Sequence, residues 1–236
     1  MFAKTSSEQN FNIIHQMATF KQGIHGKFSG KVGNIIGSSW KGTGVMRIRP
    51  ASVSNPRTPK QLNQRSRFGI VARFVQANRD LIKAGFRPWA TGITTHNAAM
   101  SYNLTHALTG DYPDVSIDYS RIMLSRGSMA KTQNLSATFS APDTLTLNWD
   151  NNANDQNSQA DNKLMVSLFD AETQAAIGYH AVADRSALTV DLLLPTDWAG
   201  KTVQVLAFFI ASGSLGSVDA KNQVSDTTFG GAVALI

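Results

Sequence analysis

Short apolar segments separated by turn-forming residues make up the second half of the chain. Seven such segments follow residue 131, and they cover positions 137–140, 144–149, 164–169, 176–181, 187–194, 202–211 and 223–229. Their lengths suit β-strands, and their spacing is typical of two antiparallel sheets that pack face to face. The pattern therefore predicts an all-β sandwich over residues 132–236.

The middle of the chain carries a helical pattern. Thr58, Pro59 and Gln61 form an N-terminal capping signal, and Gly85 is placed to end the helix. Between these signals, apolar residues fall on one side of the helical wheel and basic residues on the other. The apolar positions are Phe68, Ile70, Val71, Phe74, Val75, Leu81 and Ile82, and the basic positions are Arg65, Arg73, Arg79 and Lys83. We predict one long amphipathic helix here, followed by a shorter helix over 95–108 and a strand over 115–123.

Glycine is concentrated in the segment from Lys21 to Pro50. This segment holds seven of the eighteen glycines, and apolar and basic side chains alternate along residues 45–49. We predict two or three short basic β-strands that carry Phe28 and Trp40. Because a small isolated sheet is only marginally stable in water, these strands are expected to pack on another surface. Residues 1–20 are predicted to be a flexible or partner-ordered tail.

Charge separates the basic α+β module predicted over residues 21–131 from the sandwich predicted over 132–236. The formal net charge of +6 divides into +13 for residues 1–131 and −7 for the remainder. Between Lys21 and Arg87 there are fourteen basic residues, and Asp80 is the only acid. Like charges at this density repel one another, so the segment is expected to face a negative partner, or else to form a solvated basic surface.

Composition excludes several classes of protein. The chain of 236 residues has no cysteine, which removes disulfide frameworks and thiolate metal sites. Its longest apolar run, Val205–Ala211, is too short to span a bilayer, and its N-terminus lacks the apolar segment of a Sec signal peptide. We therefore expect no transmembrane segment, and a protein that is cytoplasmic, virion-associated or exported by another route.

Motifs for catalysis or nucleotide binding are absent at the required spacings. The five histidines show no metal-ligand spacing. The loop DNNANDQNSQADN (150–162) places oxygen-bearing side chains at calcium-loop spacing, but it lacks the central glycine, the final glutamate and the preceding helix. We interpret it as a solvated loop between strands, with calcium binding left open as the alternative. We predict no catalytic, cofactor or metal site, and no enzymatic activity.

From Met17 onward, the sequence resembles a family of bacterial proteins that is defined only as a domain of unknown function. The blocks that carry the resemblance are GKFSGKVGNIIGSSWKG (26–42), SNPRTPKQLNQRSRF (54–68), THNAAMSYNLTHALTGDYPD (95–114) and IDYSRIMLSRG (117–127). The stretch NPRTPKQLNQR (55–65) is also similar to a segment before a helix in some phage virion proteins. These resemblances imply no activity.

The C-terminal part resembles a fibronectin type III-like domain, with Trp149 as its core tryptophan. The expected fold is therefore an α+β N-terminal module, with short β-strands and two helices, followed by an all-β immunoglobulin- or fibronectin-like sandwich.

The favoured hypothesis is a structural protein that self-associates into a filament, tube or virion-like assembly. The basic module of one copy contacts the acidic sandwich of the next, which gives a homo-oligomer with head-to-tail contacts. The alternative is nucleic-acid binding by the same module, with an aromatic side chain stacked on bases. The candidate interaction residues are Lys27, Lys31, Trp40, Lys41, Arg47, Arg49, Arg65, Arg73, Arg79 and Lys83.

Overall fold

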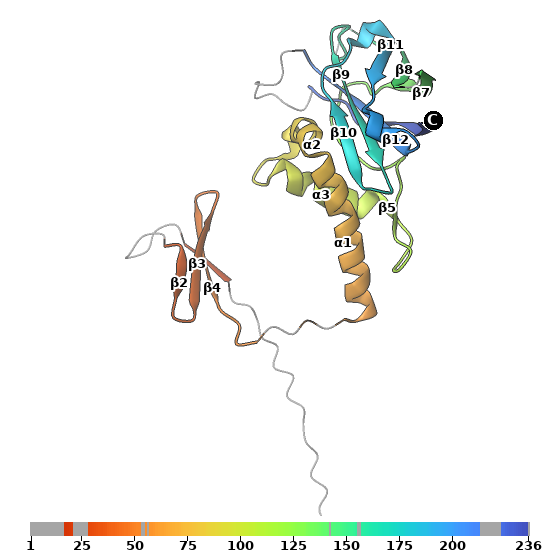
Figure 1. Cartoon of the computed structure of the whole chain (residues 1–236). Coiled ribbons are helices and arrows are strands. Elements are labelled where there is room, and N and C mark those ends of the chain that lie inside the picture. Colours follow the sequence, from red (N-terminus) through yellow and green to blue (C-terminus); the bar gives the residue numbers. More distant parts are fainter. Residues whose placement is uncertain are drawn as a thin grey trace, which may run out of the picture. The chain divides into compact units, whose positions relative to one another are not determined.

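The computed structural model describes residues 17–20, 28–52, 55, 57–141, 143–154, 157–212 and 223–235 (Figure 1). The chain divides into two compact units, Met1–Pro56 and Arg57–Ile236. The division lies inside the module predicted over 21–131, so the predicted basic strands and the predicted helices belong to different units. Among the described residues, no helix is both long enough and apolar enough to cross a membrane.

The first unit contains a four-stranded antiparallel sheet in the order β1-β4-β3-β2. Its strands are β1 (Met17–Phe20), β2 (Gly30–Val32), β3 (Ile35–Trp40) and β4 (Thr43–Ile48). Positive φ angles at Lys41 (45°) and Gly42 (83°) give the tight hairpin turn between β3 and β4 its twist. The strand β1 corrects the prediction of a tail over 1–20, because residues 17–20 pair with β4. Residues 1–16 lie outside the described part of the chain.

Helices open the second unit. They are α1 (Pro59–Ala77), α2 (Arg79–Gly85) and α3 (Thr95–His106), with a short 3-10 helix η1 (Arg87–Trp89) after α2. The predicted cap is present, because the Thr58 hydroxyl accepts a hydrogen bond from the Gln61 backbone N–H at 3.4 Å. Thr94 caps α3 in the same way, with 3.1 Å to the Asn97 backbone N–H.

Seven antiparallel strands form the two sheets of the sandwich, in the orders β10-β9-β12-β13 and β11-β8-β7. They are β7 (Gln133–Ala141), β8 (Thr144–Asp150), β9 (Lys163–Asp170), β10 (Ala175–Tyr179), β11 (Thr189–Leu193), β12 (Thr202–Ile210) and β13 (Thr228–Ala234). Short 3-10 helices η2 (Arg185–Ala187) and η3 (Thr196–Trp198) flank β11. The predicted fold class, an α+β N-terminal part followed by a sandwich, is confirmed.

Three predicted strands differ from the observed ones by more than two residues, and the first of them, predicted over 137–140, spans Gln133–Ala141. The last strand begins at Thr228 and not at 223, because Val224 and Ser225 form isolated bridges to Ile210 and Met129. The strand predicted over 115–123 is reduced to β6 (Ser116–Ile117), which pairs with β5 (Leu108–Thr109). The chain turns after β6, since the Ile122 backbone N–H donates to the Asp118 carbonyl oxygen at 3.0 Å.

Asn78 interrupts the single long helix that the sequence predicts. Its side chain is buried, and Nδ2 donates to the Phe74 carbonyl oxygen at 3.0 Å. The Asn78 Oδ1 accepts a hydrogen bond from the Ser167 hydroxyl on β9. An asparagine that bonds to its own helix competes with the helical hydrogen bonds, so α1 ends here and α2 starts as a separate helix. The same side chain ties the helices to the sandwich.

The four-stranded sheet of the sandwich is covered on both faces. One face packs against the three-stranded sheet through residues such as Leu164, Val166, Val205 and Phe209. The other face packs against the helices through Met165, Phe169, Leu206 and Phe208, which join Val71, Phe74, Leu81 and Phe86 (Figure 1). Burial on both faces explains why β9 and β12 are almost continuously apolar. The helices and the sandwich therefore form one unit, which differs from the boundary predicted between residues 131 and 132.

Residues 122–129 form a crossing segment that connects the helices to the sandwich. On one side of it, the Arg126 backbone N–H donates to the Gly85 carbonyl oxygen at 3.2 Å. On the other side, the Thr227 hydroxyl accepts hydrogen bonds from the backbone N–H groups of Leu124 and Ser125, both at 2.9 Å. The segment is thus held between α2 and the residues that precede β13.

Asp170 closes the turn between β9 and β10 with a buried carboxylate. Burial acts to raise the pKa of this group, but hydrogen bonds from the Thr173 hydroxyl and the Glu172 backbone N–H, with Lys201 at 3.8 Å, hold its pKa below the usual value. Such a carboxylate stabilises the fold at pH values above its unfolded-state pKa of about 3.9. The contribution is lost as the pH falls through the lower folded-state pKa.

We therefore expect Asp170→Asn to lower the thermal midpoint at pH 7, and to have a progressively smaller effect as the pH falls below about 4. Thermal unfolding of both proteins over this pH range checks the prediction. Glu172→Gln is the matched control, because Glu172 is exposed in the same turn. A loss of the same size at both ends of the range contradicts a role for the Asp170 charge.

Candidate functional site

The sheet of the first unit presents basic and aromatic side chains on one face. Cross-strand pairing places Lys31 opposite Ile36, and Ile36 opposite Arg47, so these three residues share that face. Trp40 lies farther along the same face of β3 and is 57% exposed. Among the described residues, neither Lys31 nor Arg47 forms an ion pair. We name the surface formed by Lys31, Trp40 and Arg47 the cationic face.

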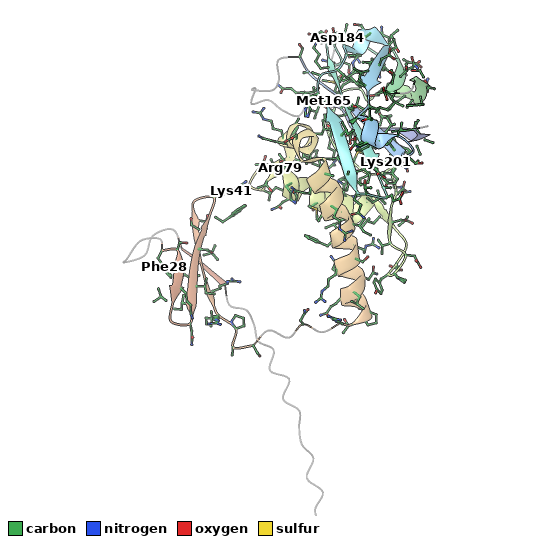
Figure 2. All side chains as sticks on the ribbon, in the orientation of Figure 1. Phe28, Lys41, Arg79, Met165, Asp184 and Lys201 are labelled. Atoms are coloured by element: carbon green, nitrogen blue, oxygen red, sulfur yellow. The ribbon has the colours of Figure 1, made fainter. Side chains whose placement is uncertain are left out.

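Three other predicted interaction residues belong to the same unit. Lys41 occupies the hairpin turn at one end of β4 and is exposed (Figure 2). Arg49 follows the other end of β4, where its backbone N–H donates to the Asn34 carbonyl oxygen at 2.7 Å. Lys27 lies outside the described residues. The structure thus gathers Lys31, Trp40 and Arg47 on one face, with Lys41 and Arg49 at the two ends of β4.

The remaining four predicted residues lie in the second unit and are exposed: Arg65, Arg73, Arg79 and Lys83. Arg73 also has a structural role, because its Nη1 donates to Gln174 Oε1 in the β9–β10 turn at 2.9 Å. Lys83 lines a pocket of about 660 Å³ together with Asp80, Arg87 and His180. These four residues therefore form no part of the cationic face.

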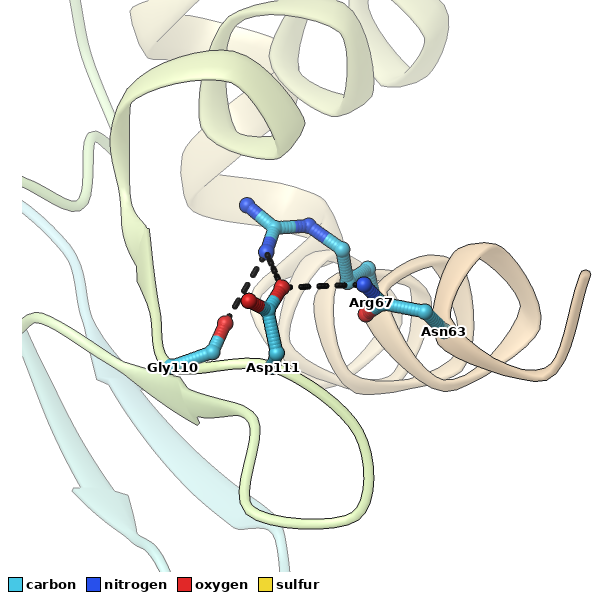
Figure 3. A network of polar contacts seen from close by, with 4 residues as sticks. All are labelled: Asn63, Arg67, Gly110 and Asp111. Carbon is cyan, nitrogen blue, oxygen red and sulfur yellow. Dashed lines mark hydrogen bonds and ion pairs between the residues drawn. The ribbon is translucent and has the colours of Figure 1, made fainter. Parts of the chain in front are cut away.

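Arg67, which the helical pattern did not single out, anchors α1 to the turn after β5. Its Nη1 donates to the Gly110 carbonyl oxygen at 3.0 Å and lies 3.8 Å from Asp111 Oδ1 (Figure 3). The same carboxylate oxygen accepts a hydrogen bond from Asn63 Nδ2 at 2.9 Å. Because Asn63 and Arg67 are one helical turn apart, they face this turn together. The positive charge of Arg67 on α1 is therefore paired with a carboxylate of the same unit.

The outer face of the three-stranded sheet carries negative charge. Most outward positions of β7, β8 and β11 hold serine, threonine or asparagine, together with the acids Asp150 and Asp191. No outward position of these strands, as far as their side chains are described, is basic. Asp191 Oδ1 accepts a hydrogen bond from the Thr146 hydroxyl at 2.6 Å. We name the surface around Asp150 and Asp191 the acidic face.

A buried arginine from η2 contacts the loop with calcium-like spacing. Arg185 is 0% exposed, its guanidinium lies 3.8 Å from the Phe209 ring centroid, and burial lowers its pKa to about 10. It donates to Asn152 Oδ1 and, at 3.0 Å, to the Ala130 carbonyl oxygen. Asn152 Oδ1, which occupies one of the calcium-loop positions, is thus bonded to the Arg185 cation. The positive charge of Arg185 disfavours the binding of a calcium ion beside it. Asp155 and Gln156 of this loop lie outside the described residues.

The loop residue Asn154 is also engaged within the protein, since its Oδ1 accepts a hydrogen bond from the Asn157 backbone N–H at 3.0 Å. In the described part of the chain, no three His, Asp or Glu side chains gather closely enough to hold a metal ion. The described part of this loop is therefore a hydrogen-bonded connection between β8 and β9.

Comparison with known proteins identifies a family. A family of unknown function, DUF6266, matches residues 26–222, a range that contains all four resembling blocks. No curated protein is significantly similar to the chain. Among solved structures, the chain is similar to the fn3 domain of the human collagen alpha-1(XX) chain, with 16% sequence identity and a TM-score of 0.33 over 47% of this chain and 90% of that one. Because the family match covers more than half of the sequence, the chain belongs to this family of unknown function, as its motifs predicted.

Proposed function

We propose that the protein is a structural component that self-associates head to tail, with the cationic face of one copy on the acidic face of the next. Among the described side chains of the first unit, the lack of a buried apolar cluster is the observation that carries this proposal. Of residues 28–52 and 55, only Gly37 and Gly44 are buried. A sheet with so little buried apolar surface is stabilised when a second surface covers it.

Charge supports the choice of the partner surface. Residues 1–56 carry a formal net charge of +6 and residues 57–236 a net charge of 0, so the first unit is basic and the acidic face is a local feature of the second unit. Lys31 and Arg47 stand on the cationic face, and Asp150 and Asp191 stand on the acidic face. Opposite charges steer two surfaces together and favour one register of contact. Because the two surfaces differ, the contact is heterologous, and its repetition gives a closed ring or an open filament.

The presence of Trp40 on the cationic face favours nucleic-acid binding as a second candidate function. A sheet that combines lysine and arginine with an exposed aromatic ring suits a single strand, because phosphates pair with the cations while a base stacks on the ring. The two candidates use the same residues and differ in the partner. One set of variants therefore tests both.

The first test compares the full chain with residues 57–236 by light scattering at about 50 mM and about 500 mM salt. The shorter chain is expected to fold, because both apolar cores consist of residues from Val71 onward. We expect the full chain to form large particles at low salt that shrink at high salt, and residues 57–236 to remain monomeric at both. A full chain that stays monomeric at high protein concentration and low salt overturns the proposal.

Charge reversal then identifies the surface. Lys31→Glu with Arg47→Glu is expected to abolish the low-salt particles, whereas Lys60→Glu with Lys131→Glu, which makes the same change in net charge in the second unit, is expected to preserve them. Retention of single-stranded DNA by the full chain at low salt, lost in the Lys31 and Arg47 variant, supports the nucleic-acid candidate instead.

A further inference from the structure

The face of the N-terminal sheet that lies opposite the cationic face is apolar and exposed. Val32 pairs with Ile35, and Ile35 pairs with Ile48, so the three side chains form one row across β2, β3 and β4. Their exposed fractions are 64%, 43% and 58%, respectively. Large aliphatic side chains that stand together and uncovered on a sheet mark an interaction surface. We name this row, with the neighbouring ring of Phe28, the apolar face.

Phe28 extends the apolar face over the adjacent row of the sheet. A Cβ atom at Gly37 would lie 2.4 Å from the Phe28 ring, so the ring rests directly on the backbone of β3 (Figure 2). Gly37 pairs with Gly30 on one side and Met46 on the other. Gly37 leaves room for the ring, which extends the apolar surface beyond the row of Val32, Ile35 and Ile48.

Charge is confined to the opposite side of this sheet. The described side chains of the apolar face include no lysine, arginine, aspartate or glutamate, because alternation along each strand places Lys31 and Arg47 on the cationic face. An uncharged aliphatic surface offers nothing to phosphates or to an acidic protein. It matches another uncharged aliphatic sheet face, and two copies can meet there without burying a basic side chain.

We infer that the apolar faces of two copies pack on each other and form a two-layer sandwich of N-terminal sheets. Packing of this kind brings sheets to about 10 Å and interdigitates their inward side chains. Ile35 is the middle residue of its row, so a twofold axis near Ile35 matches Val32 of one copy with Ile48 of the other. The inference rests on the proposed function and adds a second, isologous contact to the head-to-tail one.

A second copy fits this face better than the second unit does. The exposed large apolar residues described in the second unit lie on different helices, turns and strands, and do not form a row on one sheet: Phe68, Trp89, Ile93, Tyr112, Leu188 and Leu193. The N-terminal sheet of another copy supplies the same three-residue row. The two contacts together, one polar and one apolar, use both faces of the sheet.

The absence of cysteine from the chain permits a direct test by cross-linking. Ile35→Cys is expected to be cross-linked into a dimer by a short bis-maleimide at about 500 mM salt, where the head-to-tail contact is screened. Ser38→Cys is the matched control on the same strand, because Ser38 is exposed on the cationic side. Rapid cross-linking at position 35 and little at 38 supports the inference, whereas equal or reversed yields overturn it.

A measurement of mass complements the cross-linking. At the same salt, the unmodified chain is expected to have the mass of a dimer, while Ile35→Asp with Ile48→Asp is expected to show the monomer mass of 25.5 kDa. Ser38→Asp with Thr43→Asp adds the same charge to the opposite face and is expected to leave the dimer intact. If the low-salt particles depend on Lys31 and Arg47 while the aspartates at 35 and 48 change nothing, the head-to-tail proposal stands and the apolar contact is refuted.

Discussion

Replacement of Gly127 by alanine is expected to destabilise the second unit by about 3 kcal/mol or more. A Cβ atom at this position lies 1.9 Å from the carbonyl oxygen of Val224 and 2.7 Å from its carbonyl carbon. Both are backbone atoms, so no side chain can rotate out of the way. The partner segment is itself fixed, since the Ser225 hydroxyl accepts a hydrogen bond from the Phe209 backbone N–H at 2.9 Å.

The same experiment tests the division of the chain. If the helices and the sandwich were separate domains joined near residue 131, Gly127→Ala would loosen their connection and leave two independent unfolding transitions. The helices and the three-stranded sheet pack on opposite faces of the same four-stranded sheet. We therefore expect the variant to unfold in a single transition at a lower denaturant concentration than the wild type. Circular dichroism and tryptophan fluorescence measure this transition. Gly178→Ala is the control, since its Cβ meets the Leu81 side chain at an ordinary 3.4 Å. Equal stability of the two variants contradicts the steric argument.

Local pattern in the sequence was sufficient to predict the strands of the sandwich. Turn residues bound each apolar segment, and the alternation in β8 separates its buried leucines from its half-buried threonines. The long apolar run of β12 also predicted a buried strand. It did not reveal that α1, α2 and α3 cover the second face, because a sequence pattern reports burial and not the identity of the covering element. The sequence pattern therefore predicts a boundary near residue 131, where the structure has a continuous packed unit.

The interaction surface was predictable in part. Alternation over residues 45–49 already separates Arg47 from Ile48. The alignment of Lys31 with Arg47 depends on the register of β2, β3 and β4, which is a property of two hairpins and not of either segment alone. The exposed row of Val32, Ile35 and Ile48 could not be inferred, because isolated apolar residues among glycines do not indicate which side a strand presents. Asn78, a polar residue in a helical pattern, was an available signal for the break between α1 and α2.

Replacement of Asn103 by aspartate is expected to produce a stability loss that depends on pH. Asn103 on α3 is 0% exposed. Its side-chain amide both donates a hydrogen bond to the crossing segment and accepts one from it. Its Nδ2 donates to the Met123 carbonyl oxygen at 2.9 Å, and its Oδ1 accepts from the Met123 backbone N–H at 2.8 Å. Aspartate has the same shape, but its second oxygen meets the Met123 carbonyl without a proton to share. At pH 7 we expect a loss of about 3 kcal/mol.

Acid is expected to reverse this loss. A protonated aspartate donates where the Asn103 amide donates, so the folded state favours the protonated form and the pKa of the new carboxyl is raised by the fold. Stability of the variant should then approach that of the wild type below about pH 4, and should decline by up to about 1.4 kcal/mol per pH unit above it. Asn97→Asp is the matched control, because Asn97 is exposed in the first turn of α3, where negative charge is favourable. Denaturant unfolding at a series of pH values distinguishes the two variants, and a loss at position 103 that persists unchanged in acid would show that the Met123 pairing is not what holds the crossing segment to α3.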